Sequence, residues 1–303
     1  MLTETIDAYL ATRRAAGFEL KRVEFLLRSF ARFAVERGDR HVRQQTAIEW
    51  AALGPSAQSR DNRLGTVIRF ARHARAENNT HEVPPEHVFA FNRSRRVPYI
   101  YSPEEIRQLL EAATHLGPTE SLRPHTYRTL IGLLATTGLR VSEALGLCFD
   151  DLTDAGLVIR KTKFSKERLV PLHSTTEAAL HRYMERRRGV GGADEHVFVS
   201  LRGQRCDRTW VLRTFWRLLD DIGLYPGRLP RRPRLHDLRF TFAVRALEAC
   251  PEDCEHIGRH ALALATYMGH SSVAFNFWYL QSTPPLMTDV ADACESFLQG
   301  GAP

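Results

Sequence analysis

Six side chains that suit chemistry on a phosphate ester lie in four short segments of this 303-residue chain. In chain order the segments are TTGLRVSEALGL with Arg140, KTKFSKERLVPL with Lys163, RLPRRPRLHDLRF with His236 and Arg239, and TYMGHSSVAFNFWYL with His270 and Tyr279. His236 precedes Arg239 by three residues, so the two would lie on one face of a helix start. Two arginines, a lysine, two histidines and a tyrosine suit the attack of a phenol on a phosphodiester without a metal ion.

The arginines and the lysine would serve the phosphate and the leaving group. In the transition state the phosphorus is five-coordinate, and its two non-bridging oxygens gain negative charge that planar guanidinium groups can bind bidentately. We therefore expect Arg140 and Arg239 to clamp the phosphate. The leaving sugar oxygen needs a proton as its bond breaks, and Lys163 on a mobile hairpin could deliver it. Lys166 is the competing donor, because it lies in the same hairpin.

Tyr279 would be the nucleophile. A phenol has a pKa of about 10, so it is mostly protonated at neutral pH and needs nearby cations or an imidazole to lose its proton. We expect His236 and His270 to assist that loss and to donate hydrogen bonds to the phosphate. The phosphotyrosine ester would keep the energy of the broken DNA bond, so a free sugar hydroxyl could reverse the attack without ATP. Strand exchange, and not net hydrolysis, is the expected outcome.

Each segment has a simpler interpretation when it is taken alone. Arg140 could be a structural partner of Glu143 at the edge of the core. The aromatic run over residues 275–278 is expected to pack in a core, and Tyr279 on its own would be assigned to the core as well. The ordered set of four segments, and not any one of them, favours the chemical interpretation.

Together the four segments resemble the boxes of the tyrosine recombinase (phage integrase) family. TGLRVSEALGL resembles the first arginine box, KTKFSKERLVPL the lysine hairpin, HDLRF the His-x-x-Arg box, and YMGH followed by Tyr279 the family's ending. The similarity covers the second domain in order and spacing, whereas the front of the chain resembles the family's DNA-clamping domain only in size, helicity and charge. PRLHDLRFTFAVRAL and WYLQSTPPLM also resemble integrase-like recombinases of transposons and insertion elements.

The resemblance implies a site-specific DNA recombinase that forms a 3′-phosphotyrosyl intermediate without a metal ion, another cofactor or ATP. It implies double-stranded DNA as the partner and a tetramer on paired sites, because exchange between two duplexes needs four strand cleavages. The implied catalytic set is Arg140, Lys163, His236, Arg239, His270 and Tyr279. Two features depart from the family pattern: Phe240 stands where many relatives have a histidine, and the insertion CPEDCEHIGRH is unlike the compact relatives.

The elements that must position these residues are mostly helical. We expect a mostly α protein with a small antiparallel β-sheet, divided into a helical DNA-clamping domain over residues 1–90, a basic linker over 91–101 and an α+β catalytic domain over 102–303. Three prolines in residues 78–100 indicate the linker. GLVIRK (156–161) and ERLVPL (167–172) are expected to pair as a hairpin. Catalytic-domain helices are expected near 127–137, 176–188, 209–222, 237–249, 261–268 and 284–298.

Local signals predict where some helices begin and end. Ser102-Pro103-Glu104-Glu105 predicts an N-cap with proline at the first helical position, and Gly138 is expected to end a buried helix in a left-handed conformation. Thr46 with Glu49 resembles a capping box. In the front domain, apolar residues recur at helical spacing at Ile6, Tyr9 and Leu10, at Phe25, Leu26, Phe30 and Phe33, and at Leu64, Val67, Ile68 and Ala71.

The positive charge is concentrated at the front of the chain. The net charge is +7 and the pI about 9.4, and residues 1–97 hold 17 lysines and arginines against 11 acidic residues. Three of the four lysines fall within residues 161–166. This distribution favours a nucleic acid as partner, although an arginine face can also be simply solvated. The candidate DNA-binding residues are Arg69, Arg72, Arg95, Arg96, Lys161, Lys166, Arg231, Arg232 and Arg234.

The remaining patterns concern the compartment and a metal. Five cysteines at irregular spacing do not form a disulfide framework, no apolar stretch is long enough to span a membrane, and the first residues are unlike a signal peptide. We therefore expect a cytoplasmic, nucleoid-associated protein without a membrane partner. Cys250, Cys254, His256 and His260 could in principle bind zinc, but their spacing matches no common finger, and a helix end with adjacent loop is the favoured interpretation.

Two other functions use much of the same evidence. A type IB topoisomerase would employ nearly the same residues to nick and reseal a single duplex, and a DNA-binding regulator could keep the fold without the chemistry. The basic front domain and the integrase-like wording favour recombination over the first, and the six filled catalytic positions argue against the second. The helix expected over 284–298 could pack either on a neighbouring subunit or on its own domain.

Overall fold

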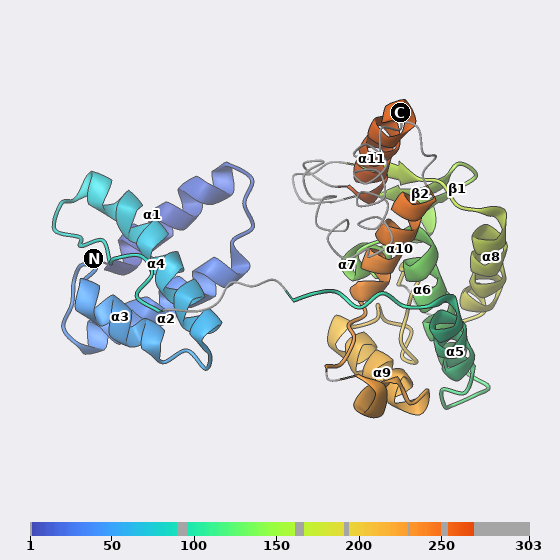
Figure 1. The fold of residues 1–303 in the computed structure, drawn as a ribbon. Coiled ribbons are helices and arrows are strands. Elements are labelled where there is room, and N and C mark those ends of the chain that lie inside the picture. Colours follow the sequence, from blue (N-terminus) through green and yellow to red (C-terminus); the bar gives the residue numbers. More distant parts are fainter. Residues whose placement is uncertain are drawn as a thin grey trace, which may run out of the picture. The chain divides into compact units, whose positions relative to one another are not determined.

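The fold is given by a computed structural model, which describes residues 2–89, 96–160, 167–190, 194–229, 231–249 and 254–269. The chain forms two compact units, Met1–Arg95 and Arg96–Pro303 (Figure 1). The exact bounds that the sequence suggests for the clamping domain and linker stay a prediction. In the second unit, Tyr101 is fully buried in the core although it falls at the end of the predicted linker.

The first unit consists of four described helices. They are α1 (Leu2–Ala15), α2 (Lys21–Glu36), α3 (Gln44–Ala52) and α4 (Ala57–Glu77). Their apolar faces meet in one core, where the rings of Phe30 and Trp50 pack edge to face with centroids 5.5 Å apart. Phe25 does not join this core: 68% of it is exposed, although it shares the helical spacing of its neighbours.

The predicted capping box at Thr46 and Glu49 is wrong. Helix α3 begins at Gln44, and its N-cap residue Arg43 makes no side-chain cap. The carboxylate of Glu82, from the segment after α4, accepts the backbone N–H of Gln44 at 2.8 Å and so satisfies one of the first N–H groups of the helix. Thr46 instead donates its hydroxyl to Asp39 Oδ2 at 2.5 Å. A tertiary contact therefore replaces the local cap.

The second unit places a small sheet beside a group of helices (Figure 1). Its helices are α5 (Pro103–Thr114), α6 (Leu122–Thr137), α7 (Val141–Ala144), α8 (Ser174–Arg188), α9 (Arg208–Asp221), α10 (Asp237–Glu248) and α11 (Cys254–Met268). A short 3₁₀ turn at Phe149–Asp151 and a π turn at Leu224–Arg228 complete the helical elements of the described part. The mostly helical fold with a small antiparallel sheet confirms the predicted class.

The sheet has three short antiparallel strands in the order β1-β2-β3. They are β1 (Leu152–Thr153), β2 (Gly156–Ile159) and β3 (Arg168–Val170), and the register pairs Val158 with Leu169. Strands β2 and β3 confirm the predicted hairpin, although both are shorter than expected. Strand β3 begins at Arg168, shortly after the segment 161–166 that holds the three clustered lysines. That segment lies outside the described residues.

Helix α6 lies at the centre of this unit. It packs against α5, α8 and α10, and its buried residues lie on several sides of the helix, as an apolar sequence over 127–137 predicts. Helix α5 begins with the predicted cap: Ser102 accepts the N–H of Glu105, and the Glu105 side chain accepts the N–H of Ser102. Helix α11 begins at Cys254, earlier than expected.

Candidate active site

A glycine turn at the end of α6 positions Arg140. Gly138 adopts the left-handed conformation, with φ of 60°, and Arg140 follows as the N-cap residue of α7. A Cβ at position 138 would lie 2.5 Å from Cδ1 of Phe242 in α10, so a larger residue would clash there as well as strain the backbone. The close approach of α6 and α10 at this point brings the first arginine segment next to the helix that carries Arg239.

Glu143 holds Arg140 through both its backbone and its side chain. Glu143 Oε2 accepts the backbone N–H of Arg140 at 2.9 Å, and Oε1 accepts from Arg140 Nη1 at 2.7 Å. Arg168 from β3 donates to the same carboxylate, with Nη1 3.1 Å from Oε1 and Nη2 2.9 Å from Oε2. The simpler interpretation of Arg140, a structural partner of Glu143, is therefore part of the observed arrangement.

The electrostatics of Glu143 follow from these contacts. Its side chain is only 7% exposed, and burial, the largest single influence, would raise its pKa. The hydrogen bonds from Arg168 and from the Arg140 backbone, together with the nearby positive charges, outweigh burial and lower the pKa to about 2. Glu143 is therefore a carboxylate throughout the neutral range.

The state of Glu143 predicts a pH dependence of stability. A carboxylate whose pKa is lowered in the folded protein stabilises it fully above the unfolded value of 4.5, and this contribution is lost as the pH falls from 4.5 through about 2. We expect the full loss to reach about 3 kcal/mol of unfolding free energy, since each tenfold change in proton affinity corresponds to ~1.4 kcal/mol. Urea unfolding at pH 5 and pH 3, with Glu143→Gln as the control, measures the part of this loss that falls between those two pH values, roughly half of it. Equal losses in both proteins would contradict the assignment.

Arg239 lies deeper than Arg140. It projects from the first turn of α10, is 3% exposed, and donates from Nη1 to Gly138 O at 2.6 Å and from Nη2 to Met268 O at 2.7 Å. Arg140 is the more open of the two, with 36% of its side chain exposed. Arg239 thus joins the turn that carries Arg140 to the end of α11.

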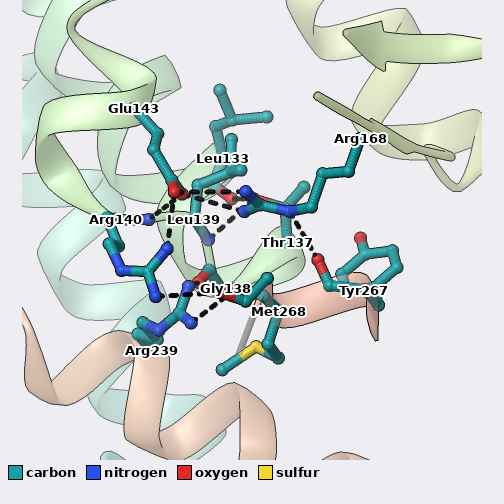
Figure 2. Close-up of polar contacts among 11 residues, drawn as sticks. Leu133, Thr137, Gly138, Leu139, Arg140, Glu143, Arg168, Arg239, Tyr267 and Met268 are labelled. Carbon is teal, nitrogen blue, oxygen red and sulfur yellow. Dashed lines mark hydrogen bonds and ion pairs between the residues drawn. The ribbon is translucent and has the colours of Figure 1, made fainter. Parts of the chain in front are cut away.

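Three arginines meet the carbonyls of the last two residues of α11 and of the residue that follows it, Gly269 (Figure 2). Tyr267 O accepts from Arg168 Nε at 2.8 Å, Met268 O from Arg239, and Gly269 O from Arg140 Nη2 at 3.1 Å. The final carbonyls of a helix lack partners within the helix and form the negative end of its dipole, so cationic donors stabilise them. The structure therefore brings Arg140 and Arg239 together at the helix end that directly precedes residue 270.

His236 lies one turn before Arg239, as the N-cap residue of α10. The residue is exposed, yet the protein atoms around its ring, followed by the charges of Arg239 and Arg234, lower its pKa to about 4 against the opposing influence of Asp237. Arg140 contributes in the same direction, which places His236 within the field of both predicted clamp arginines. Its imidazole is neutral at pH 7.

The other three predicted catalytic residues lie outside the described part of the chain. They are Lys163, His270 and Tyr279. Two of the arginine contacts described above lie close in sequence to these positions. Arg168, which donates to Tyr267 O, follows the lysine segment along β3, and Gly269, which accepts from Arg140, immediately precedes His270. The proposed roles of the six residues stay a prediction.

The candidate DNA-binding arginines make varied contacts. Arg69 donates to Thr66 Oγ1 at 3.3 Å, and the exposed Arg72 pairs with Glu86 at 2.6 Å. Arg232 pairs with Asp220 and stacks on the ring of Tyr225, with 4.7 Å from Cζ to the centroid.

In the same group, Arg96 donates to the backbone oxygen of Arg232, while Arg234 pairs with the buried Asp237 at 2.8 Å and Arg231 is exposed. Arg95, Lys161 and Lys166 lie outside the described residues.

The possible zinc ligands are only partly described. Cys250 lies outside the described residues, and Nε2 of His260 lies 2.6 Å from the backbone oxygen of Ala246 in α10. The predicted helix over 284–298 also falls outside the described residues. None of the described helices is both long and apolar enough to cross a membrane.

Sequence reasoning missed Arg168 and Gly269. Arg168 begins the strand that follows the clustered lysines. Its role depends on contacts with Glu143, 25 residues earlier, and with Tyr267, 99 residues later. A signal was available: Arg168 is a long cationic side chain in a short strand, so burial would require it to have a carboxylate partner. Gly269 could have been expected as the left-handed residue after α11, where its φ is 66°.

Comparison with known proteins gives consistent matches over most of the chain. Residues 100–284 match the model of the phage integrase family. A Sinorhizobium fredii protein, y4rB, whose name describes an integrase/recombinase, is 38% identical over 94% of each chain. Tyrosine recombinase XerC of Pelobacter propionicus is 29% identical over 84% of this chain and 86% of its own. The Tn1549 transposon integrase, solved in complex with transposon right end DNA, has a TM-score of 0.66 at 17% identity and covers 96% and 99% of the two chains.

Proposed function

Because this chain belongs to the phage integrase family and is a tyrosine-type site-specific recombinase, we propose that it cuts and rejoins DNA through a 3′-phosphotyrosyl ester on Tyr279. The observation that supports this most is the meeting of Arg140 and Arg239 at the end of α11, directly before His270. Two guanidinium groups held by backbone carbonyls are fixed before substrate arrives, which is the preorganisation that a charged transition state requires.

The proposed reaction exchanges one phosphate ester for another. The phenol of Tyr279 gives its proton to a neutral imidazole, and its oxygen forms a bond to phosphorus as the bond to the 5′ oxygen of the sugar breaks. Lys163 transfers a proton to that leaving oxygen, and Arg140 and Arg239 stabilise the negative charge on the non-bridging oxygens. Rejoining is the reverse, with a 5′ hydroxyl as nucleophile, and needs no ATP because the ester energy is retained.

A neutral histidine suits the proton transfers in this scheme. A neutral imidazole has one N–H donor and one acceptor nitrogen, so His236 can accept a hydrogen bond from the phenol and donate one to the phosphate. Its pKa of about 4 keeps it in this form through the neutral range. We assign the second imidazole, His270, to the same work because the residue before it is fixed by Arg140.

We further propose that double-stranded DNA contacts the basic first unit and the approach formed by residues 228–239. The relevant arginines in the described part include Arg72 and Arg231, which are exposed. Exchange between two duplexes requires four cleavages, so we propose a tetramer on paired sites. The likeness to a transposon integrase supports a role in moving a mobile element, in the compartment where cellular DNA lies.

Binding to DNA should weaken steeply with salt. Each phosphate that an arginine or lysine neutralises releases condensed counterions, so a contact with six phosphates would lower affinity about a thousandfold between 50 and 200 mM salt. Titration of a labelled duplex by fluorescence anisotropy measures the slope. Arg72→Ala and Arg231→Ala should each reduce it by about one phosphate. A flat salt dependence would contradict the proposed clamp.

The function is tested on a duplex that carries the protected site found by footprinting DNA next to the coding region. With a nick beside the cleavage position, cleavage frees a short fragment that carries the 5′ hydroxyl. This fragment diffuses away, so rejoining is prevented and the covalent protein–DNA ester accumulates. We expect this adduct in buffer with EDTA, and joined recombinant products from two intact sites. Relaxation of supercoiled DNA without recombinants would favour a topoisomerase. Binding without any adduct would favour a regulator and overturn the proposal.

A further inference from the structure

Arg168 uses all three of its guanidinium nitrogens in contacts with elements that flank the site. Nη1 and Nη2 donate to the two oxygens of Glu143 in a two-pronged ion pair, and Nε donates to Tyr267 O (Figure 2). The side chain is 9% exposed, which is unusual for an arginine unless its charge is paired. A planar guanidinium makes such a fixed fork, which a lysine ammonium does not.

These contacts link the three chain segments that hold or adjoin the predicted catalytic residues Lys163, Arg140 and His270. Arg168 begins β3, which follows the lysine segment at 161–166; Glu143 lies in α7, whose N-cap residue is Arg140; and Tyr267 lies in the last turn of α11, before His270. Movement of any of these elements would stretch a contact of Arg168. The side chain therefore couples the hairpin to the arginine segment and to the helix end.

The charge balance gives Arg168 a second effect. Glu143 alone would neutralise much of the charge of Arg140, which lies 2.7 Å away. With Arg168 on the same carboxylate, two cations share one anion, and the trio keeps a net positive charge. Because Arg168 is buried and Arg140 is 36% exposed, that surplus is presented to an incoming anion through Arg140.

The backbone of Gly269 packs closely against the guanidinium of Arg168. A Cβ at position 269 would lie 2.7 Å from Arg168 Nη1 and 2.9 Å from Cζ, and the residue adopts a φ of 66°. A side chain there would displace the guanidinium from its fork. The close packing therefore fixes Arg168 from the side that leads to His270.

We propose that Arg168 is a positioning residue for DNA cleavage: through Glu143 it holds Arg140 in place and leaves its positive charge available to the scissile phosphate. This inference rests on the proposed function, since it assigns Arg140 to the phosphate. Arg168 itself does not touch the substrate. Its loss should therefore act on the chemical step and leave the affinity for DNA nearly unchanged.

The test compares two forms of the scissile phosphate in single-turnover cleavage of the nicked duplex. One duplex has an ordinary scissile phosphodiester. In the other it is a methylphosphonate, in which a methyl group replaces one non-bridging oxygen and removes the negative charge, so that cleavage depends less on Arg140. For Arg168→Lys we expect a loss of about 10- to 100-fold on the phosphodiester, as for supporting residues of other sites, and a much smaller loss on the methylphosphonate. Affinity for the duplex should change less than about twofold.

Arg187→Lys is the matched control. Arg187 is a buried arginine of α8 that donates to the backbone oxygens of Val190, Asp194 and His196. Among the described residues, it has no hydrogen bond or ion pair with Arg140, Glu143 or Arg168. Its replacement can lower stability, but it should alter cleavage of both duplexes by the same factor. Each variant is assayed at least about ten degrees below its own melting temperature.

A second variant covers the case in which Arg168→Lys does not fold. Glu143→Gln with Arg168→Gln removes both buried charges, which is milder than leaving one of them alone. If Arg168 acts through Glu143, the double variant should also lose much less cleavage on the methylphosphonate than on the phosphodiester. Equal losses on both duplexes, as in the control, or wild-type cleavage by Arg168→Lys would overturn the inference. Wild-type protein that forms no adduct would overturn the proposed function instead.

Discussion

Tyr279→Phe should form no covalent adduct with DNA while it binds the same duplex with the affinity of the wild-type protein. The change removes one oxygen, the atom that we propose attacks phosphorus, and the ring remains to fill whatever space it occupies. Loss of a nucleophile of this kind lowers turnover by about a millionfold in well-studied hydrolases, so no cleavage should be detectable. Denaturing gels of the nicked duplex and anisotropy of the intact one measure the two quantities.

The control for this variant is the tyrosine at position 267. Its phenol lies 3.4 Å from Pro171 O, and burial raises its pKa to about 12, so it is unsuited to ionise. Tyr267→Phe should therefore keep adduct formation within about tenfold of the wild-type rate. An adduct on the Tyr279→Phe protein, or its loss in Tyr267→Phe alone, would show that the attacking phenol has been assigned wrongly.

Arg140→Ala is expected to slow cleavage by about a hundred- to a thousandfold, the usual cost of removing one donor to a developing oxyanion. The fold should survive, because Glu143 keeps both hydrogen bonds from Arg168 and the backbone N–H of residue 140. Single-turnover cleavage at saturating protein separates this loss from any change in affinity.

A neighbouring arginine outside the site supplies the comparison. Arg160 pairs with Asp151 at 2.8 Å, and 49% of its side chain is exposed. Arg160→Ala removes the same charge from the same domain, and we expect cleavage to fall less than about tenfold, since exposed ion pairs contribute little. If Arg140→Ala slowed cleavage no more than Arg160→Ala, the clamp would lose its main support.

Local sequence rules predicted the parts of the fold that local interactions determine. The cap at Ser102, the left-handed Gly138 and the hairpin before Val170 depend on residues within a few positions, and the structure confirms all three. The same rules failed at Thr46. There a carboxylate from residue 82 satisfies the helix start, and no pattern within the helix reveals a partner so far along the chain.

The candidate site divides in the same way. Residue types and order indicated Arg140, Arg239 and His236, and the structure brings these three together. The arrangement that joins them could not be predicted, because it depends on three arginines meeting the carbonyls at the end of one helix. Arg168 was overlooked for this reason: its partners lie far from it in sequence, so its place in a short strand could suggest a carboxylate partner but could not identify Glu143.

The most direct test of the account is to identify the residue that becomes attached to DNA. The adduct from the nicked duplex is digested with a protease and a nuclease, and the peptide that carries the residual nucleotide is sequenced by tandem mass spectrometry. We predict a single modified peptide, with the phosphate ester on the oxygen of Tyr279 and the DNA joined through its 3′ end. A nucleotide on any other residue, or one joined through its 5′ end, would contradict the central claim.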